Sequence, residues 1–170
     1  GDQNRTDIRY DEMPEVLINA VVAIEDERFW DHSGVDFKAI LRAARSNVSA
    51  GGISQGGSTI TQQYVKQILL TAATTKEEQD AATATSINRK LREARYAIAL
   101  ENKLSKKEIL EGYLNIAYFG AGSYGVEIAA RRYYSTNADK LTLSQAATLA
   151  GLVQNPSRFD PTQFPERAQN

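Results

Sequence analysis

Three consecutive acids, Glu25, Asp26 and Glu27, precede a pair of aromatic residues and His32, the only histidine of the chain. Like charges this close together disfavour one another's ionisation, so one of the three carboxyl groups is expected to have a raised pKa. A carboxylate with a pKa near neutrality can accept a proton from a reacting hydroxyl. The acid cluster is therefore a candidate for a general base, and a solvated helix end is the alternative interpretation.

A second polar segment combines hydroxyl and amide side chains. Ser58, Thr59, Gln62 and Gln63 could form hydrogen bonds with a sugar or a phosphate. A Ser-Thr pair just before a helix is equally typical of a helix cap, so the pattern leaves both interpretations open. Lys66, three residues further on, would add a positive charge within about one helical turn of the amides.

Arg89, Lys90 and Glu93 form a third polar group. A guanidinium can grip a phosphate with two hydrogen bonds, whereas an ammonium acts as a point charge. Arg89 and Glu93 also have the spacing of a helix-surface ion pair, which is worth only roughly a few tenths of a kcal/mol. Ordinary surface charge is thus the alternative interpretation, and so weak a pair does not prevent these residues from binding an anion.

The composition excludes several classes of function. The 170 residues carry 20 Lys and Arg against 21 Asp and Glu, so no excess of positive charge is available to hold nucleic acid. The absence of cysteine excludes disulfides and thiolate-bound metals, and one histidine cannot form a His-rich metal site. The longest nearly apolar run, Leu17 to Ile24, is far shorter than the roughly 20 residues needed to span a bilayer.

Helical periodicity must position these groups. Pro14 suits a first helical turn, and an apolar stripe then leads to the acid cluster. A second helix is predicted from Phe37 to Val48, with Asp36 as its cap and an apolar face. A glycine-rich loop separates it from a third helix, Thr59 to Leu70. The residues of the first stripe are Val16, Leu17, Ala20, Val21 and Ile24.

The second half of the chain also has helical patterns. Thr71 to Thr85 lacks an apolar stripe and is predicted to be a mobile surface excursion. Ser86 should cap a helix that ends near Asn102. Ser105 and Thr142 open two capping boxes, and a short helix is predicted at 126–134 between them. No segment alternates like a strand, so the fold is predicted to be mostly α. The inward face of the helix after Ser86 would carry Ile87, Leu91, Ala94 and Ile98.

Five blocks in order resemble the motifs of one enzyme family. Glu25 to Gly34 fits E-D-x-x-F-x-x-H-x-G, Gly57 to Gln63 resembles G-x-S-T-x-T-Q-Q apart from a second glycine, and Arg89 to Glu93 fits R-K-x-x-E. The other two blocks are Ile109 to Asn115, continuing to Phe119-Gly120, and Leu149 to Pro156. A lone motif carries a false-positive risk, but five in order are similar to the family 51 glycosyltransferases, the peptidoglycan polymerase domains of class A penicillin-binding proteins.

The resemblance implies a lysozyme-like helical fold and a transfer reaction. The sugar of lipid II, a lipid-linked disaccharide-peptide, would move to the 4-hydroxyl of another such sugar, giving a β-1,4 glycan and releasing undecaprenyl diphosphate. The hydroxyl needs a base, and the diphosphate needs cations. The motifs imply that Glu25 is the base, that Lys66, Arg89 and Lys90 contact the diphosphate, and that Glu93 is a second essential acid.

The motifs also imply a set of supporting residues. Three roles stay open for Glu93: to orient the acceptor, to bind a divalent cation such as Mg²⁺ near the diphosphate, or to hold the basic residues in place. No cofactor is implied with certainty. Thr85 departs from the family, in which a basic residue often stands four positions before the arginine of the third motif. One diphosphate contact is therefore missing or supplied elsewhere. The supporting residues are Asp26, Phe29, His32, Tyr113 and Asn115.

Residues 1–170 are predicted to be one domain, a piece of a longer membrane-anchored bacterial protein at the extracytoplasmic face of the cell membrane. The expected partners are lipid II, the growing glycan strand, the membrane surface and cell-wall synthesis proteins. Val35 to Ile53 is the span predicted to touch lipid, and packing of its apolar face in the core is the alternative. Two other functions stay open: a lysozyme-like glycan hydrolase and a non-catalytic glycan-binding module.

Overall fold

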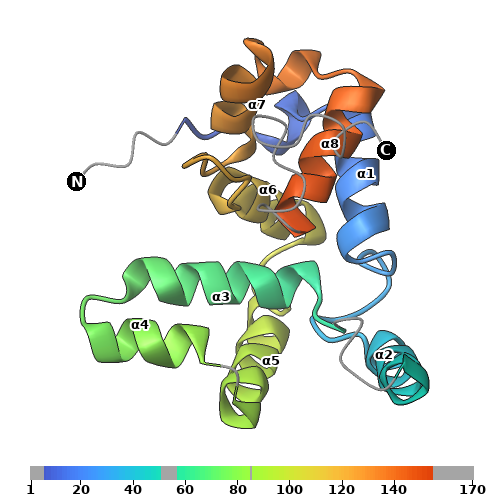
Figure 1. The fold of residues 1–170 in the computed structure, drawn as a ribbon, viewed down its shortest axis with the longest axis vertical. Helices are drawn as coiled ribbons and strands as arrows, with labels where there is room; N and C mark the ends of the chain where they lie inside the picture. Colours follow the sequence, from blue (N-terminus) through green and yellow to red (C-terminus); the bar gives the residue numbers. More distant parts are fainter. Residues whose placement is uncertain (1–5, 51–56, 85, 155–170) are drawn as a thin grey trace. The chain divides into compact units, whose positions relative to one another are not determined.

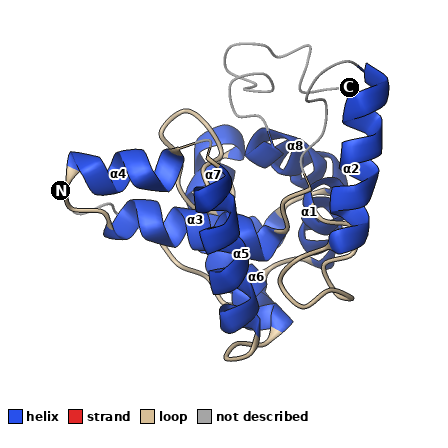
Figure 2. Cartoon of the chain, turned by 90° about the horizontal axis from the view of Figure 1, so that it is seen from below, coloured by secondary structure: helices blue, strands red, loops and turns tan. Residues whose placement is uncertain are grey.

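The computed structural model describes residues 6–50, 57–84 and 86–154. Every regular element in these ranges is helical, as Figure 2 shows, and β pairing there is limited to one isolated bridge between Tyr118 and Tyr124. The prediction of a mostly α, lysozyme-like domain is confirmed. The chain packs as two compact units, one made of Gly1–Glu27 with Leu110–Asn170 and the other of Arg28–Ile109.

The first unit is built around α1, which packs against α8 (Figure 1). Leu17 and Val21 on α1 are fully buried, so the helical period of apolar residues forms the contact. The helix ends at Glu25, and the acid cluster lies at a helix end as predicted. The helices of this unit are α1 (Glu15–Glu25), the end of α6 (Lys106–Ile116), α7 (Val126–Tyr134) and α8 (Leu143–Gln154), with 3-10 turns at Tyr10–Glu12 and Ala138–Lys140.

The second unit is organised by α3, which contacts both α4 and α5. Figures 1 and 2 show α3 crossing α5, so residues near the crossing are neighbours in space although far apart in sequence. The boundary between the units falls within α6. The other helices of this unit are α2 (Phe37–Ala50), α3 (Ile60–Ala72), α4 (Lys76–Thr83) and α5 (Ile87–Glu101).

The predicted helix starts are confirmed by their cap hydrogen bonds. The hydroxyl of Ser86 accepts the Arg89 N–H at 3.2 Å. In the capping box of α6, the Ser105 hydroxyl accepts the Glu108 N–H at 3.2 Å. The corresponding bond at Thr142 is also 3.2 Å long. These contacts span only three residues, which is why the local sequence could predict them.

The segment from Thr71 to Thr85, predicted to be a mobile surface excursion, contains a regular helix, because residues 76–83 form α4. Thr75 caps this helix by accepting the Glu78 N–H at 3.1 Å, and the Glu78 carboxylate accepts the Thr75 N–H in return. The helix then packs on α3 and buries Ala82. A capping box and one small buried residue are thus enough here without an apolar stripe. Thr85 itself, the glycines at 51–56 and the predicted stop at Pro156 lie outside the described residues.

The predicted inward face of α5 is also wrong. Ile87 is 78% exposed and Leu91 58% exposed, whereas the buried positions are Arg89, Glu93 and Ala97. The physical reason is that the two charged residues form an ion pair with each other, which lowers the cost of burying them. Ala94 is half-buried and Ile98 is 42% exposed, so the apolar stripe lies on the outer side of the helix.

Asp36 caps α2 as predicted, with its carboxylate accepting the Ala39 N–H at 3.1 Å. The interpretation that the apolar face of α2 packs in the core is wrong, because Phe37 is 74% and Val48 83% exposed. Among residues 37–48 of this helix, Ala43 is buried. None of the helices in the described ranges is both long enough and apolar enough to cross a bilayer.

Candidate active site

Three basic side chains from two helices of the second unit interact electrostatically, and one of them pairs with a buried carboxylate. Arg89 and Glu93 form an ion pair on α5, and both side chains are almost wholly buried. Burial lowers the pKa of the neighbouring Lys90, Glu93 raises it, and the positive charges of Arg89 and Lys66 lower it. Lys66 of α3 therefore lies close enough to α5 to act on its side chains electrostatically.

This cation cluster, defined by Lys66, Arg89 and Lys90, is suited to an anion. The Nε atom of Arg89 is buried and has no hydrogen-bond partner among the described residues. Such an N–H costs free energy when it stays unpaired, and positive charges held together repel one another. A phosphate group would relieve both costs, because its oxygens accept hydrogen bonds and carry negative charge.

The segment before α3 divides its polar side chains between the cluster and the helix cap. The Lys90 ammonium donates a hydrogen bond to the Ser58 hydroxyl at 2.5 Å. Thr59 instead caps α3: its hydroxyl accepts the Gln62 N–H at 3.1 Å, and the Gln62 side chain accepts the Thr59 N–H at 2.8 Å. Gln63 is half-buried on the same helix. Ser58 thus lies beside the cations, whereas Thr59 and Gln62 hold the helix start.

The loop after the acid cluster is tied to the second motif and to α5. His32 is buried and accepts the Gly34 N–H at its Nδ1 atom over 3.0 Å, and the Phe29 ring lies edge-on to it with centroids 6.0 Å apart. The Gly34 carbonyl accepts the Thr59 hydroxyl at 2.7 Å. Gly34 has a φ of +112°, and a Cβ there would lie 2.8 Å from the backbone of Ala97. Only glycine permits this close approach of the loop to α5.

Glu25 lies in the first unit, at the end of α1, and its Oε1 atom is buried. Burial raises the pKa of Tyr113 well above its usual value, and the charge of Glu25 raises it further, so the two side chains are close. Asp26 is the buried C-cap residue of α1, whereas Glu27 is exposed. The base candidate and the cation cluster are therefore each formed within their own unit.

Asn115 has two partners on the N-terminal segment of the first unit. Its side chain accepts the Ile8 N–H at 3.0 Å and donates to the Ile8 carbonyl at 2.9 Å. Nearby, Glu111 accepts the Tyr10 N–H at 2.8 Å. Of the two fourth-motif residues predicted to support the site, Tyr113 lies near Glu25, and Asn115 ties the N-terminal segment to α6.

A second buried ionic cluster in the same unit as the cations was missed at the sequence level. Glu101 at the end of α5 and Lys106 at the start of α6 form an ion pair, and both contact His32 at 3.4 Å. The sequence could have indicated the position of Glu101, because it stands eight residues after Glu93 and therefore lies on nearly the same face of the helix.

The surroundings of Glu93 do not suit a divalent cation. Magnesium prefers oxygen ligands in octahedral geometry. Glu93 is paired with Arg89, and Lys90 is its other charged neighbour in the cluster. In the described part of the chain, no three acidic or histidine side chains come together in a group that could hold a metal ion.

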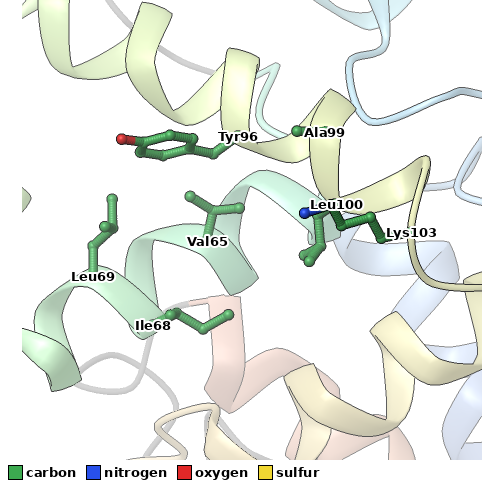
Figure 3. A pocket seen from close by; sticks show the side chains of 7 residues that line it. All are labelled: Val65, Ile68, Leu69, Tyr96, Ala99, Leu100 and Lys103. Atoms are coloured by element: carbon green, nitrogen blue, oxygen red, sulfur yellow. The ribbon is translucent and has the colours of Figure 1, made fainter.

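An apolar cavity of about 280 Å³ lies between α3 and α5. Figure 3 shows Val65, Leu69 and Tyr96 facing this space, with the Lys103 ammonium pointing toward it. None of the predicted site residues lines the cavity. It therefore leaves part of the contact between the two helices unfilled.

The comparisons with known proteins agree on one family. The family model described as Transglycosylase matches residues 1–170. Penicillin-binding protein 1A of Aquifex aeolicus (strain VF5) is 46% identical over 168 residues, which cover 99% of this chain and 22% of that protein. The same-named protein of Neisseria flavescens is 43% identical over 169 residues, 99% of this chain and 20% of that protein. That of Streptococcus pneumoniae (strain ATCC BAA-255 / R6) is 39% identical over 170 residues, 100% of this chain and 22% of that protein. The chain thus spans about a fifth of the length of these relatives.

Proposed function

Because this chain belongs to the transglycosylase family, we propose that it is a peptidoglycan glycosyltransferase that polymerises lipid II into β-1,4-linked glycan strands. The observation that carries the proposal is the cation cluster, in which Arg89 pairs with the buried Glu93 and the charges of Lys66 and Arg89 both act on Lys90. A diphosphate leaving group needs such a concentration of positive charge, and a neutral glycan does not.

In the proposed reaction, Glu25 accepts the proton of the acceptor 4-hydroxyl as its oxygen attacks the anomeric carbon of the donor sugar. The bond from that carbon to the diphosphate oxygen breaks on the opposite face, so the configuration inverts. Undecaprenyl diphosphate leaves with the electron pair. A positioned base of this kind contributes about 10²- to 10⁴-fold to the rate.

The cations neutralise the charge that develops on the leaving diphosphate. Arg89 can offer its buried Nε together with further N–H groups, and Lys66 and Lys90 add point charges. Glu93 holds the Arg89 guanidinium through the ion pair, so we assign it the role of orienting the cluster. Ser58 can exchange its bond with Lys90 for a bond to a phosphate oxygen.

We also propose that α2 contacts the membrane in which the lipid-linked substrate lies. Phe37 and Leu41 on this helix are 74% and 54% exposed, and the helix carries Lys38, Arg42 and Arg45 without any acidic residue. Apolar side chains among basic ones favour an anionic lipid surface. The predicted location at the extracytoplasmic face of a bacterial membrane agrees with this role.

A lysozyme-like hydrolase is the alternative enzyme. Its catalytic glutamic acid would protonate an alkoxide leaving group from an apolar pocket, without cations beside the reacting bond. A non-catalytic glycan-binding module would need neither the base nor the cations. The cation cluster favours the transferase over both.

The test is to incubate the protein with lipid II in detergent, because loss of a membrane anchor could lower the activity artificially. Glycan strands that lengthen with time, and that Lys66→Met and Lys90→Met variants fail to make, are expected. Lys103→Met, which removes an exposed lysine outside the cluster, is the matched control. Shortening of preformed glycans without polymerisation would instead identify a hydrolase, and no reaction on either substrate would favour the binding module.

A further inference from the structure

We infer that Glu101 and Lys106 are positioning residues of the transfer reaction, which hold α3 against α5 so that the cation cluster keeps its spacing. The inference rests on the proposed function. Neither residue belongs to the motif positions predicted to touch substrate, and both lie in the same compact unit as the cations.

Glu101 is the centre of the contacts. Its side chain is 7% exposed, and its Oε2 atom accepts the Thr61 hydroxyl at 3.3 Å and lies 3.4 Å from Nδ1 of His32. Its Oε1 atom pairs with the Lys106 ammonium. One carboxylate thus joins the first turn of α3, the loop of the first motif and the start of α6.

Lys106 extends this network on the other side. Its ammonium lies 4.6 Å from the centroid of the Phe29 ring and 3.4 Å from Nδ1 of His32. A cation over an aromatic face is attracted to it, which adds to the ion pair with Glu101. The side chains of Glu101 and Lys106 together hold two aromatic residues of the first motif.

We call the contacts of Glu101 and Lys106 the clamp. The cation cluster needs this clamp because the positive side chains repel one another across α3 and α5. Lys66 on α3 and Arg89 on α5 both lower the pKa of Lys90, so bringing these helices together without an anion has an electrostatic cost. The apolar cavity between Val65, Leu69 and Tyr96 also leaves the contact between the two helices incompletely filled. Thr61 stands five residues before Lys66 on α3, so its bond to Glu101 fixes the end of the helix that carries this cation.

Loss of this clamp should weaken diphosphate binding and the transfer rate more than it lowers the free energy of unfolding. Replacing both partners of a buried ion pair costs little net stability because desolvation offsets the attraction, whereas removing Lys106 alone leaves the Glu101 carboxylate without its cation and lowers the stability. A shift of about 1 Å in a catalytic group can cost about 100-fold in rate. We therefore expect Glu101→Gln, which keeps an acceptor for Thr61 but loses the charge, to loosen the cation spacing without unfolding the protein.

The experiment compares Glu101→Gln, Lys106→Met, the double variant and Lys106→Arg with the unchanged protein. Binding of inorganic pyrophosphate is measured by calorimetry at low salt, kcat and KM are measured with lipid II, and folding is monitored by circular dichroism and thermal midpoint. The two single variants and the double variant should each lose about tenfold in pyrophosphate affinity and in kcat, with KM little changed. Lys106→Arg should restore most of both, and Lys103→Met, which removes an exposed lysine three residues earlier, should match the unchanged protein.

Three results would overturn the inference. Folded single variants could bind pyrophosphate and transfer sugar as the unchanged protein does, or the losses could only follow the unfolded fraction. The unchanged protein could also fail to bind pyrophosphate. By contrast, clamp-dependent pyrophosphate binding without any polymerisation of lipid II would refute the proposed reaction while supporting the clamp.

Discussion

Arg89 and Glu93, one turn apart on α5, form an ion pair whose side chains are only 8% and 2% exposed. Arg131 and Glu127 have the same spacing on α7, but there the arginine is 53% exposed. Identical spacing in the sequence thus produces one pair with both side chains buried, inside the cation cluster, and one pair in which Glu127 is buried but the arginine reaches solvent.

Arg89→Met should destabilise the protein by about 3 kcal/mol, because it leaves the Glu93 carboxylate buried without its partner. Arg131→Met should cost no more than about 1 kcal/mol, since that arginine is half-exposed and the Glu127 carboxylate keeps the hydrogen bond from the Ala138 N–H. The double variant Arg89→Met/Glu93→Met should regain much of the stability but not the binding of pyrophosphate. Urea unfolding and calorimetry measure the two properties, and equal costs for the two single variants would contradict the assignment of a buried pair.

Pyrophosphate binding should weaken as the pH rises, because Lys90 loses its positive charge. This loss should begin at a lower pH than for a solvent-exposed lysine, since burial and nearby cations lower the pKa of Lys90. The same lowered pKa makes the free energy of unfolding increase, not decrease, as the pH rises through this range. Charged Lys90 is disfavoured in the fold, so this cost is present below its lowered pKa and disappears as the pH rises through the usual lysine pKa. Lys90→Arg should abolish the alkaline loss of binding, since arginine stays charged. Pyrophosphate titrations of both proteins across the alkaline range measure this, and coincident profiles would contradict it.

Glu25→Gln should reduce polymerisation of lipid II by about 10²- to 10⁴-fold, because the amide cannot accept the proton of the acceptor hydroxyl. Binding of pyrophosphate should be unchanged. The pKa of Tyr113 should fall, because one of the two causes of its rise is the charge of Glu25. Nuclear magnetic resonance of labelled tyrosine measures that pKa. Glu27→Gln, which changes an exposed acid, is the control. An equal loss of activity in this variant would contradict the assignment of Glu25 as the base.

Phe37→Ser and Leu41→Ser should weaken binding to vesicles that contain phosphatidylglycerol. Full burial of such a side chain is worth about 1.5–3 kcal/mol, so each substitution should lower the partition coefficient about tenfold. Added salt should weaken binding further, because α2 carries three basic residues. Leu143→Ser is the matched control, since this residue is 66% exposed on α8. Equal losses in all three variants would show that α2 is not a specific contact.

Much of the local structure could be predicted from neighbouring residues. The cap hydrogen bonds of Ser86, Ser105 and Thr142 span three residues each, and the apolar period of α1 placed Glu25 at a helix end. The helix α4 was missed because its capping box, at Thr75, lies in a segment without an apolar stripe. Local patterns therefore predicted most helix starts but not the contact with α3 that gives this helix a buried side.

The chemical groups, their order along the chain and most of the helices that carry them could be predicted from the amino-acid sequence, because helix formation depends on residues a few positions apart. Only the tertiary structure decided that the polar face of α5 is the buried one, with Leu91 outside and Glu93 inside. It also decided that Glu101 meets Thr61, forty residues earlier in the chain. The physical reason is that a charge can be buried at low cost only when partners compensate it, and several of those partners come from distant segments.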